Sequence, residues 1–194
     1  MRNVTDIVRE SIAVKEALIG NAQLVQTIGL VAQALIDAFK ADRKVLFCGN
    51  GGSAADAQHI AAELSGRFYF DRPPLYAEAL HVNSSFVTAI ANDYSYDEVF
   101  ARSVRGSGRT GDVLVGITTS GNSPNVVKAI EVAKNVGMIA VAMTGETGGR
   151  LAGMCDHLIN VPSRDTARIQ ESHIMIGHIV CELVEASLFG ERRN

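Results

Sequence analysis

The sequence predicts an α/β fold, a three-layer α/β/α sandwich of the flavodoxin-like kind around a mainly parallel five-stranded sheet, with two helices ahead of it. Apolar runs of strand length alternate with stretches of helical periodicity, and two of the strand ends lead into polar loops. The chain has 194 residues, of which 47% are apolar, enough for one buried core. Because strand–helix–strand units of this spacing form right-handed crossovers within one sheet, we expect a single domain over residues 1–194.

Residues 1–42 are predicted to hold two helices, 4–18 and 22–41, that precede the first strand. Apolar residues recur in both at helical spacing, and Gly20-Asn21 interrupts the pattern. Each helix is apolar over a wide arc. That arc suits packing on the chain's own sheet, and it equally suits covering a partner subunit in an oligomer.

The sandwich itself is predicted over residues 43–194. The predicted strands are 45–49, 76–81, 112–117, 138–143 and 157–161. The first predicted helix begins at Ser53, whose side chain is expected to cap it. The other predicted helices are 83–90, 96–105, 125–136, a short helix opened by Gly148-Gly149, and a long C-terminal helix, 167–189.

Composition and charge exclude several classes of function. The net charge is −3 and Lys and Arg are dispersed, so no polycation is available for nucleic acid. The three cysteines, Cys48, Cys155 and Cys181, follow no metal-binding spacing and are expected to be buried, reduced thiols of a cytoplasmic protein. No stretch is expected to be long and apolar enough to cross a membrane, and the N-terminus lacks the layout of a signal peptide.

A glycine-rich loop follows the first predicted strand. Gly49, Gly51 and Gly52 surround Asn50, and a helix begins at Ser53. Such a loop exposes backbone N–H groups beside a helix N-terminus, which favours a phosphate or another polar ligand. The glycine spacing is neither that of a dinucleotide turn nor that of a phosphate loop with its lysine, so the familiar nucleotide-binding motifs are excluded.

Polar side chains also interrupt two otherwise apolar helices. His59 and Glu63 are four residues apart, which places them on one face of the helix after the glycine loop. Gln170 and His178 are eight residues apart on the C-terminal helix and can share a side of it. An exposed ion pair and a core histidine are the ordinary explanations, but the apolar flanks favour an enclosed polar site.

A second polar loop follows the buried strand 112–117. It contains Thr118, Thr119, Ser120 and Ser123, with Pro124 at the start of the next helix. Hydroxyls and backbone amides without a charged side chain suit a bound phosphate, and simple turn chemistry is the alternative. The carboxyl ends of parallel strands meet at one edge of a sheet, so both loops are expected to serve one ligand.

Three segments together resemble a known family. The loop 49–53 (Gly-Asn-Gly-Gly-Ser), the turn 119–123 (Thr-Ser-Gly-Asn-Ser) and the helix start 168–171 (Arg-Ile-Gln-Glu) are similar to the sugar isomerase (SIS) domain of the phosphoheptose isomerases. The resemblance covers nearly the whole chain. It implies isomerisation of sedoheptulose 7-phosphate to D-glycero-D-manno-heptose 7-phosphate, a first step toward ADP- or GDP-heptose. It also implies a homotetramer with active sites between subunits and one zinc ion per subunit.

The resemblance carries site residues with it. The zinc ligands would be His59, Glu63, Gln170 and His178, of which Glu63 and Gln170 would also contact substrate. The sugar phosphate would be held by Asn50, Gly51, Gly52, Ser53, Asn92, Asp93, Thr118, Thr119, Ser120 and Ser123. One position departs from the pattern, because Ala167 stands where some members of the family carry an acid, so no role of that acid is transferred.

Two other functions compete with the isomerase. A paralogue in the same family binds the bacterial replication initiator, but it lacks the carboxylate and histidine that stand here as Glu63 and His178 and has an arginine at the place of Ser120. The third alternative is a sugar-phosphate sensor without turnover. A sensor would keep the phosphate turn but has no need of a zinc site, so the sequence favours the enzyme.

The implied reaction moves a proton between adjacent carbons through an enediolate. Glu63 is the first choice of base and His178 of partner acid. Both also stand as metal ligands, and a tightly bound ligand is a poor base. Either one of them exchanges off the metal during turnover, or Asp93 or a hydroxide on the metal moves the proton.

Overall fold

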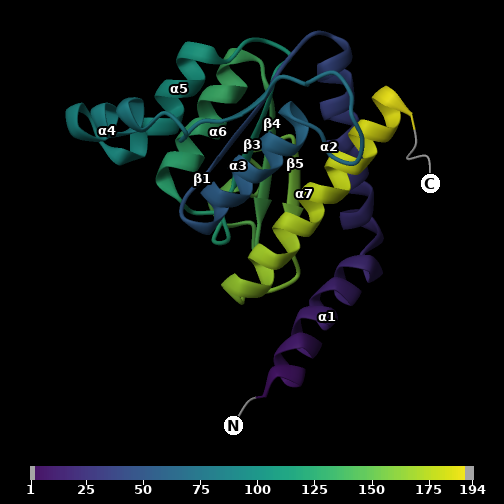
Figure 1. Ribbon diagram of the computed structural model, residues 1–194. Coiled ribbons are helices and arrows are strands. Elements are labelled where there is room, and N and C mark those ends of the chain that lie inside the picture. The colour runs from purple at the N-terminus through teal and green to yellow at the C-terminus, as the bar shows by residue number, and fades with distance from the viewer. Residues whose placement is uncertain (1–2, 191–194) are drawn as a thin grey trace.

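The computed structural model describes residues 3–190 and confirms the predicted α/β sandwich (Figure 1). The sheet has five strands in the order β2-β1-β3-β4-β5, and every neighbouring pair is parallel. The strands are β1 (Val45–Gly49), β2 (Ala77–Ala79), β3 (Val113–Ile117), β4 (Ile139–Thr144) and β5 (His157–Asn160). Since Gly49 of β1 pairs with Ile117 of β3, the two polar loops leave the sheet side by side, at the point where the strand order reverses.

Seven α-helices and two short 3-10 turns complete the described chain. They are α1 (Val4–Gly20), α2 (Ala22–Lys40), α3 (Gly52–Ser65), α4 (Ser84–Asp93), α5 (Val99–Ser107), α6 (Pro124–Val136) and α7 (Thr166–Phe189), with turns η1 (Tyr96–Glu98) and η2 (Gly149–Leu151). Helices α2, α3 and α7 contribute to one hydrophobic cluster against the sheet, and α5 and α6 contribute to a second cluster on its other face.

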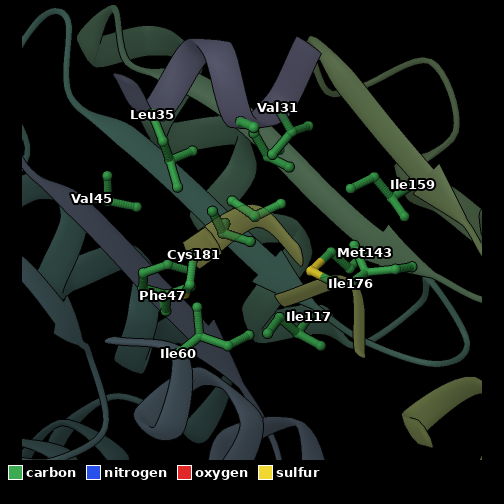
Figure 2. Close-up of a cluster of buried hydrophobic side chains, with 14 of the residues drawn as sticks. Val31, Leu35, Val45, Phe47, Ile60, Ile117, Met143, Ile159, Ile176 and Cys181 are labelled. Carbon is green, nitrogen blue, oxygen red and sulfur yellow. The ribbon is translucent and has the colours of Figure 1, made fainter. Parts of the chain in front are cut away.

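The side chains of each central strand alternate between these two clusters. Phe47 points toward α2, α3 and α7, whereas Leu46 and Cys48 lie in the cluster with α5 and α6. Figure 2 shows the first cluster, in which Phe47 lies near Ile60 of α3 and Cys181 of α7. Burial on both faces explains why the strands read as continuous apolar runs.

Several predicted boundaries need correction. Gly51, not Ser53, is the N-cap residue of α3; its φ of 55° is in the left-handed region, and no side chain caps the helix. The second strand is limited to Ala77–Ala79, although the backbones of Tyr76 and Leu80 on either side still hydrogen-bond to β1. The predicted helix 96–105 begins as the turn η1. The predicted Asn83 cap of α4 is confirmed, since its side chain accepts a hydrogen bond from the backbone N–H of Phe86.

Two expectations from composition are also corrected. Helices α2 and α7 are long and apolar enough to span a membrane by length and composition, contrary to the expectation that no stretch would be. Their buried side chains pack in the cluster against the sheet, which accounts for that composition.

The three cysteines are free, and Cys48 and Cys181 are buried as expected, but Cys155 is only half-buried. Burial raises the pKa of the Cys48 and Cys181 thiols to about 12.

Helix α1 extends away from the body of the molecule (Figure 1). Leu18 is its only residue counted as buried, and it leaves Val4, Ile7, Val8, Ile12 and Ile19 exposed. Two hydrogen bonds and an ion pair attach it to the start of α7. Arg168 donates to the Ile7 carbonyl at 3.1 Å, the Ser11 hydroxyl donates to Glu171 at 2.6 Å, and Lys15 lies 3.9 Å from Glu171. Exposed apolar side chains are therefore concentrated on the helix that leaves the body of the molecule.

Candidate active site

His59, Glu63 and His178 form a group whose ligand atoms all lie within 4.8 Å of one another. The Nε2 atoms of His59 and His178 are 2.9 Å apart, and Glu63 Oε1 lies 3.3 Å from His59 Nε2. Helix α3 supplies His59 and Glu63, whose four-residue spacing places them on one face, and α7 supplies His178. The structure thus brings together three of the four residues expected to bind zinc.

Close packing of the two helices produces this group. Gly177, next to His178, lies directly against Ile60, next to His59: a Cβ at position 177 would overlap Ile60 Cδ1 and lie 2.7 Å from its Cγ1. Ile60 and Gly177 are both buried in the core. The absence of a side chain at position 177 therefore sets the separation of α3 and α7 at the level of the two histidines.

The donor set fits a metal ion. Two imidazole nitrogens and a carboxylate are ligands typical of a catalytic zinc site, which keeps further positions open for substrate.

Asp56, one turn before His59, was missed by the sequence analysis although its three-residue spacing from His59 was visible. Its Oδ2 is buried and has no hydrogen-bond partner among residues 3–190. Burial raises the pKa of the Asp56 carboxyl, and the nearby His59 and His178 oppose that shift.

Gln170 lies against the glycine loop. A Cβ at position 52 would overlap the Gln170 amide nitrogen and lie 3.1 Å from its Cδ, so a side chain there would displace the Gln170 amide. Gln170 precedes His178 by eight residues, roughly 12 Å along the axis of α7. The structure therefore places Gln170 beside the expected substrate loop, and its part in a metal shell stays a prediction.

Asn50 connects the two polar loops. Its side-chain amide exchanges two hydrogen bonds of 2.9 Å with the amide of Asn125, a buried residue of α6, and accepts a third at 3.1 Å from the Tyr96 hydroxyl. The sequence analysis missed Asn125 and Tyr96; a polar residue directly after Pro124 was the available signal. Asn50 thus fixes the two loops relative to each other. The next residues differ in burial, since Gly51 and Gly52 are exposed and the Ser53 side chain is buried.

Three hydroxyls of the second polar loop lie close together. Thr118 Oγ1 lies 2.9 Å from Ser123 Oγ and 3.4 Å from Ser120 Oγ, and Ser120 Oγ accepts from the backbone N–H of Asn122. Ser123 precedes α6 without capping it by its side chain. The Thr119 carbonyl accepts from the N–H of Gly145, which joins this loop to the one after β4. Hydroxyls beside a helix N-terminus suit an anion.

Asn92 and Asp93 lie apart from the histidine group. They are exposed at the C-terminal end of α4, where the Asn92 amide donates to Asp93 at 2.9 Å. Asp93 is not a member of the His59–Glu63–His178 group. Their expected substrate contacts therefore stay predictions.

A pocket of about 300 Å³ opens at the carboxyl edge of the sheet. Thr119 and Ser120 line it together with Gly145, Ser163, Thr166 and Ile169. An exposed ion pair of 2.6 Å between Arg164 and Glu146 lies at its rim. The second polar loop, residues 118–123, thus faces a cavity large enough for a small polar ligand.

His173 illustrates the ordinary explanation for a histidine in an apolar helix. It is fully buried on α7, and its Nε2 lies 3.1 Å from the Thr144 carbonyl. Burial lowers its pKa to about 4, so the ring is neutral at physiological pH. His173 is a core residue one turn beyond Gln170, in contrast to His178.

Comparison with known proteins adds the family. Residues 10–145 match the model of the SIS domain. The phosphoheptose isomerase of Mycobacterium tuberculosis is 55% identical over 192 residues, which cover 99% of this chain and 98% of that protein. The phosphoheptose isomerase of Aneurinibacillus thermoaerophilus is 52% identical over 94% of this chain and 92% of its own.

Solved structures agree with these relatives. The phosphoheptose isomerase of Neisseria gonorrhoeae superposes with a TM-score of 0.88 at 45% identity, covering 94% of this chain and 97% of that one. The phosphoheptose isomerase of Francisella tularensis gives 0.89 at 38% identity, covering 93% and 95%. The chain therefore belongs to the SIS domain family and, within it, to the phosphoheptose isomerases.

Proposed function

We propose that this chain is an aldose–ketose isomerase that converts sedoheptulose 7-phosphate to D-glycero-D-manno-heptose 7-phosphate. The observation that carries the proposal is the His59–Glu63–His178 group, formed in a chain 55% identical to a phosphoheptose isomerase. The product would feed ADP- or GDP-heptose synthesis for surface polysaccharides such as lipopolysaccharide. The proposed compartment is the cytoplasm, where sugar phosphates are made.

We further propose that each subunit holds one zinc ion at His59, Glu63 and His178, with Gln170 as a fourth ligand. A bound zinc ion would supply Lewis-acid polarisation of the substrate carbonyl, worth several kcal/mol. Because a tightly bound ligand is a poor base, Glu63 would have to leave the metal before it takes the proton from C1 of the ketose and returns it to C2. The hydroxyl proton would move from O1 to O2, with His178 as the first choice of carrier on the same condition, so that the enediolate collapses to the aldose.

The substrate phosphate is assigned to the hydroxyl turn. Thr118, Ser120 and Ser123 converge beside the N-terminus of α6, and Gly51 and Gly52 would provide backbone N–H groups from the adjacent loop. Thr119 and Gln170 would bind sugar hydroxyls between the phosphate and the zinc group. Asn92 and Asp93 would close the site from α4.

A homotetramer with sites between subunits is part of the proposal. The exposed apolar residues of α1 support it, because Val4, Val8, Ile12 and Ile19 project from a helix that leaves the body of the protomer. Burying such a face against second copies of the chain would place residues of one subunit near the site of another.

Metal removal tests the proposed reaction. Purified protein dialysed against a chelator is expected to lose turnover of sedoheptulose 7-phosphate, and stoichiometric zinc is expected to restore it, with the aldoheptose phosphate identified by NMR. Turnover that persists in metal-free protein would contradict the zinc assignment. A folded, zinc-loaded protein that leaves the sugar unchanged would contradict the isomerase and direct the next experiment to a pull-down with the replication initiator.

Ser120→Ala tests the phosphate assignment. The substitution removes one hydroxyl of the turn and leaves the Thr118–Ser123 contact of 2.9 Å in place. Since it alters a part of the substrate remote from the reacting carbons, KM is expected to rise about tenfold with kcat changed by less than about threefold. Ser107→Ala on α5 is the matched control, with no expected change in KM. A lower kcat at unchanged KM in Ser120→Ala would argue against phosphate binding there.

A further inference from the structure

Residues 66–73, the first part of the segment between α3 and β2, are held by a buried ion pair. We call this segment the Arg72 strap. Arg72 Nε donates to Glu185 Oε1 at 3.0 Å, and both side chains are only 2% exposed. Burying two charges is costly unless every polar atom finds a partner. The other hydrogen bonds of Arg72 and Glu185 therefore identify the parts of the chain that the ion pair fixes.

Arg72 binds the end of α3. Its Nη2 donates to the Glu63 carbonyl at 2.8 Å, and its Nη1 donates to the carbonyls of Leu64, Gly66 and Pro73 at 2.7, 3.2 and 3.1 Å. The carbonyls of Glu63, Leu64 and Gly66 lie at the C-terminal end of α3, where a helix runs out of its own hydrogen-bond donors. One guanidinium thus fixes the last turn of α3, which carries Glu63.

Glu185 binds the strap from the other side. Its two carboxylate oxygens accept the backbone N–H groups of Phe68 and Tyr69 at 3.1 and 2.8 Å, in addition to Arg72. Glu185 lies seven residues after His178 on α7, two turns along nearly the same face. The carboxylate therefore fixes the strap backbone relative to the helix that carries His178.

Phe68 is placed against His178 by this arrangement. The centroid of its ring lies 5.7 Å from the centroid of the imidazole, with 33° between the planes, and 4.3 Å from the ring of Tyr69. The imidazole is thus bounded by the Phe68 ring and by His59, whose ring centroid lies 5.0 Å away. The χ2 torsion of histidine, which rotates the imidazole, has a broad energy profile. Rings on both sides of the imidazole restrict it to one orientation.

We propose that Phe68 is a positioning residue, held by the buried Arg72–Glu185 pair, whose ring keeps the His178 imidazole turned with Nε2 toward His59 and Glu63. Residues that contact a metal-binding side chain, without binding the metal themselves, commonly contribute about 10- to 100-fold to metal affinity because they fix the orientation of that side chain. The inference rests on the proposed function in one respect, that this group binds a metal ion. It does not depend on which sugar phosphate is the substrate.

Zinc affinity and the spectrum of the cobalt-substituted protein test this role. Phe68→Leu is expected to weaken zinc binding at least about tenfold in competition with a chromogenic chelator, and to change the cobalt absorption bands, because His178 gains freedom. Phe68→Tyr keeps the ring and is expected to bind zinc within about twofold of wild type. In kinetics at saturating zinc, Phe68→Leu is expected to lower kcat more than it raises KM.

A second pair of variants separates positioning from general stability. Glu185→Gln keeps the volume but removes the charge that holds the strap, and is expected to weaken zinc binding in the same direction as Phe68→Leu. The control is Asp112→Asn at the amino ends of β1 and β3. Asp112 is also 2% exposed, pairs with Lys44 at 2.6 Å and accepts the N–H groups of Lys44 and Arg109. This variant is expected to lower the melting temperature and leave zinc affinity unchanged.

The outcomes distinguish this inference from the proposed function. Wild-type protein that binds no zinc would contradict the proposed metal site and this inference with it. Zinc bound by wild type and by Phe68→Leu with equal affinity and equal cobalt spectra would overturn the positioning role alone. Weaker zinc binding in Asp112→Asn, matching Glu185→Gln, would also overturn it, because the effect would then follow global stability.

Discussion

Replacing Glu63 with glutamine is expected to lower kcat by about a thousandfold or more, within the range that a positioned base contributes. Glu63 brings the carboxylate to the His59–Glu63–His178 group, and its side chain is about a quarter exposed (26%), open enough to meet a substrate. Glutamine keeps the shape and the four-residue spacing from His59 but cannot accept a proton. The fold should be intact, because glutamine is a good helix former.

The measurement should separate a base from a metal ligand. We would determine bound zinc, circular dichroism and kcat on the same samples of wild type and Glu63→Gln, and follow exchange of the substrate C–H with solvent deuterium by NMR. Glu131→Gln, an exposed carboxylate on α6 at the other face of the sheet, is the matched control. Recovery of turnover and exchange at saturating zinc would confine Glu63 to metal binding and leave Asp93 as the candidate base.

Gly177→Val is expected to destabilise the protein by about 1–3 kcal/mol and to weaken zinc binding by more than tenfold. The added Cβ would overlap Ile60 Cδ1 in a position where both residues are buried, and overpacking a filled core costs free energy of that order. Relief of the overlap requires α7 to move away from α3. Because His59 and His178 flank the contact, their Nε2 atoms would move apart from 2.9 Å.

Chemical unfolding of the zinc-free protein and chelator competition measure the two effects. The control is Gly29→Val on α2, where a new Cβ meets nothing within 4 Å. It is expected to change the free energy of unfolding by less than about 0.5 kcal/mol, since valine and glycine differ little in helix propensity. A Gly177→Val protein with wild-type stability and zinc affinity would show that the α3–α7 contact does not set the histidine geometry.

The parts of the fold that were predicted correctly depend on the pattern of apolar and polar residues over short stretches of sequence. Strand and helix alternation, the Asn83 cap and the placement of both polar loops at carboxyl ends of strands all follow from residues close together in the sequence. The N-cap of α3 was misplaced for a local reason as well, because a glycine at φ of 55° turns the chain before the serine that looked like a cap. The half-buried Cys155 shows that an apolar neighbourhood in sequence does not fix burial.

What the sequence by itself determined was the α/β order of the elements, the His59–Glu63 pair on one helix and the hydroxyl turn from Thr118 to Ser123. Each depends on helical or strand periodicity, which acts over a few residues. The family resemblance implied that His178 and His59 share one site, and the tertiary structure brings them together across 119 residues of chain. Only the tertiary structure decided that Arg72 would pair with Glu185 across 113 residues. Such contacts depend on how closely two helices pack, and a glycine at position 177 sets that distance only when Ile60 lies opposite it.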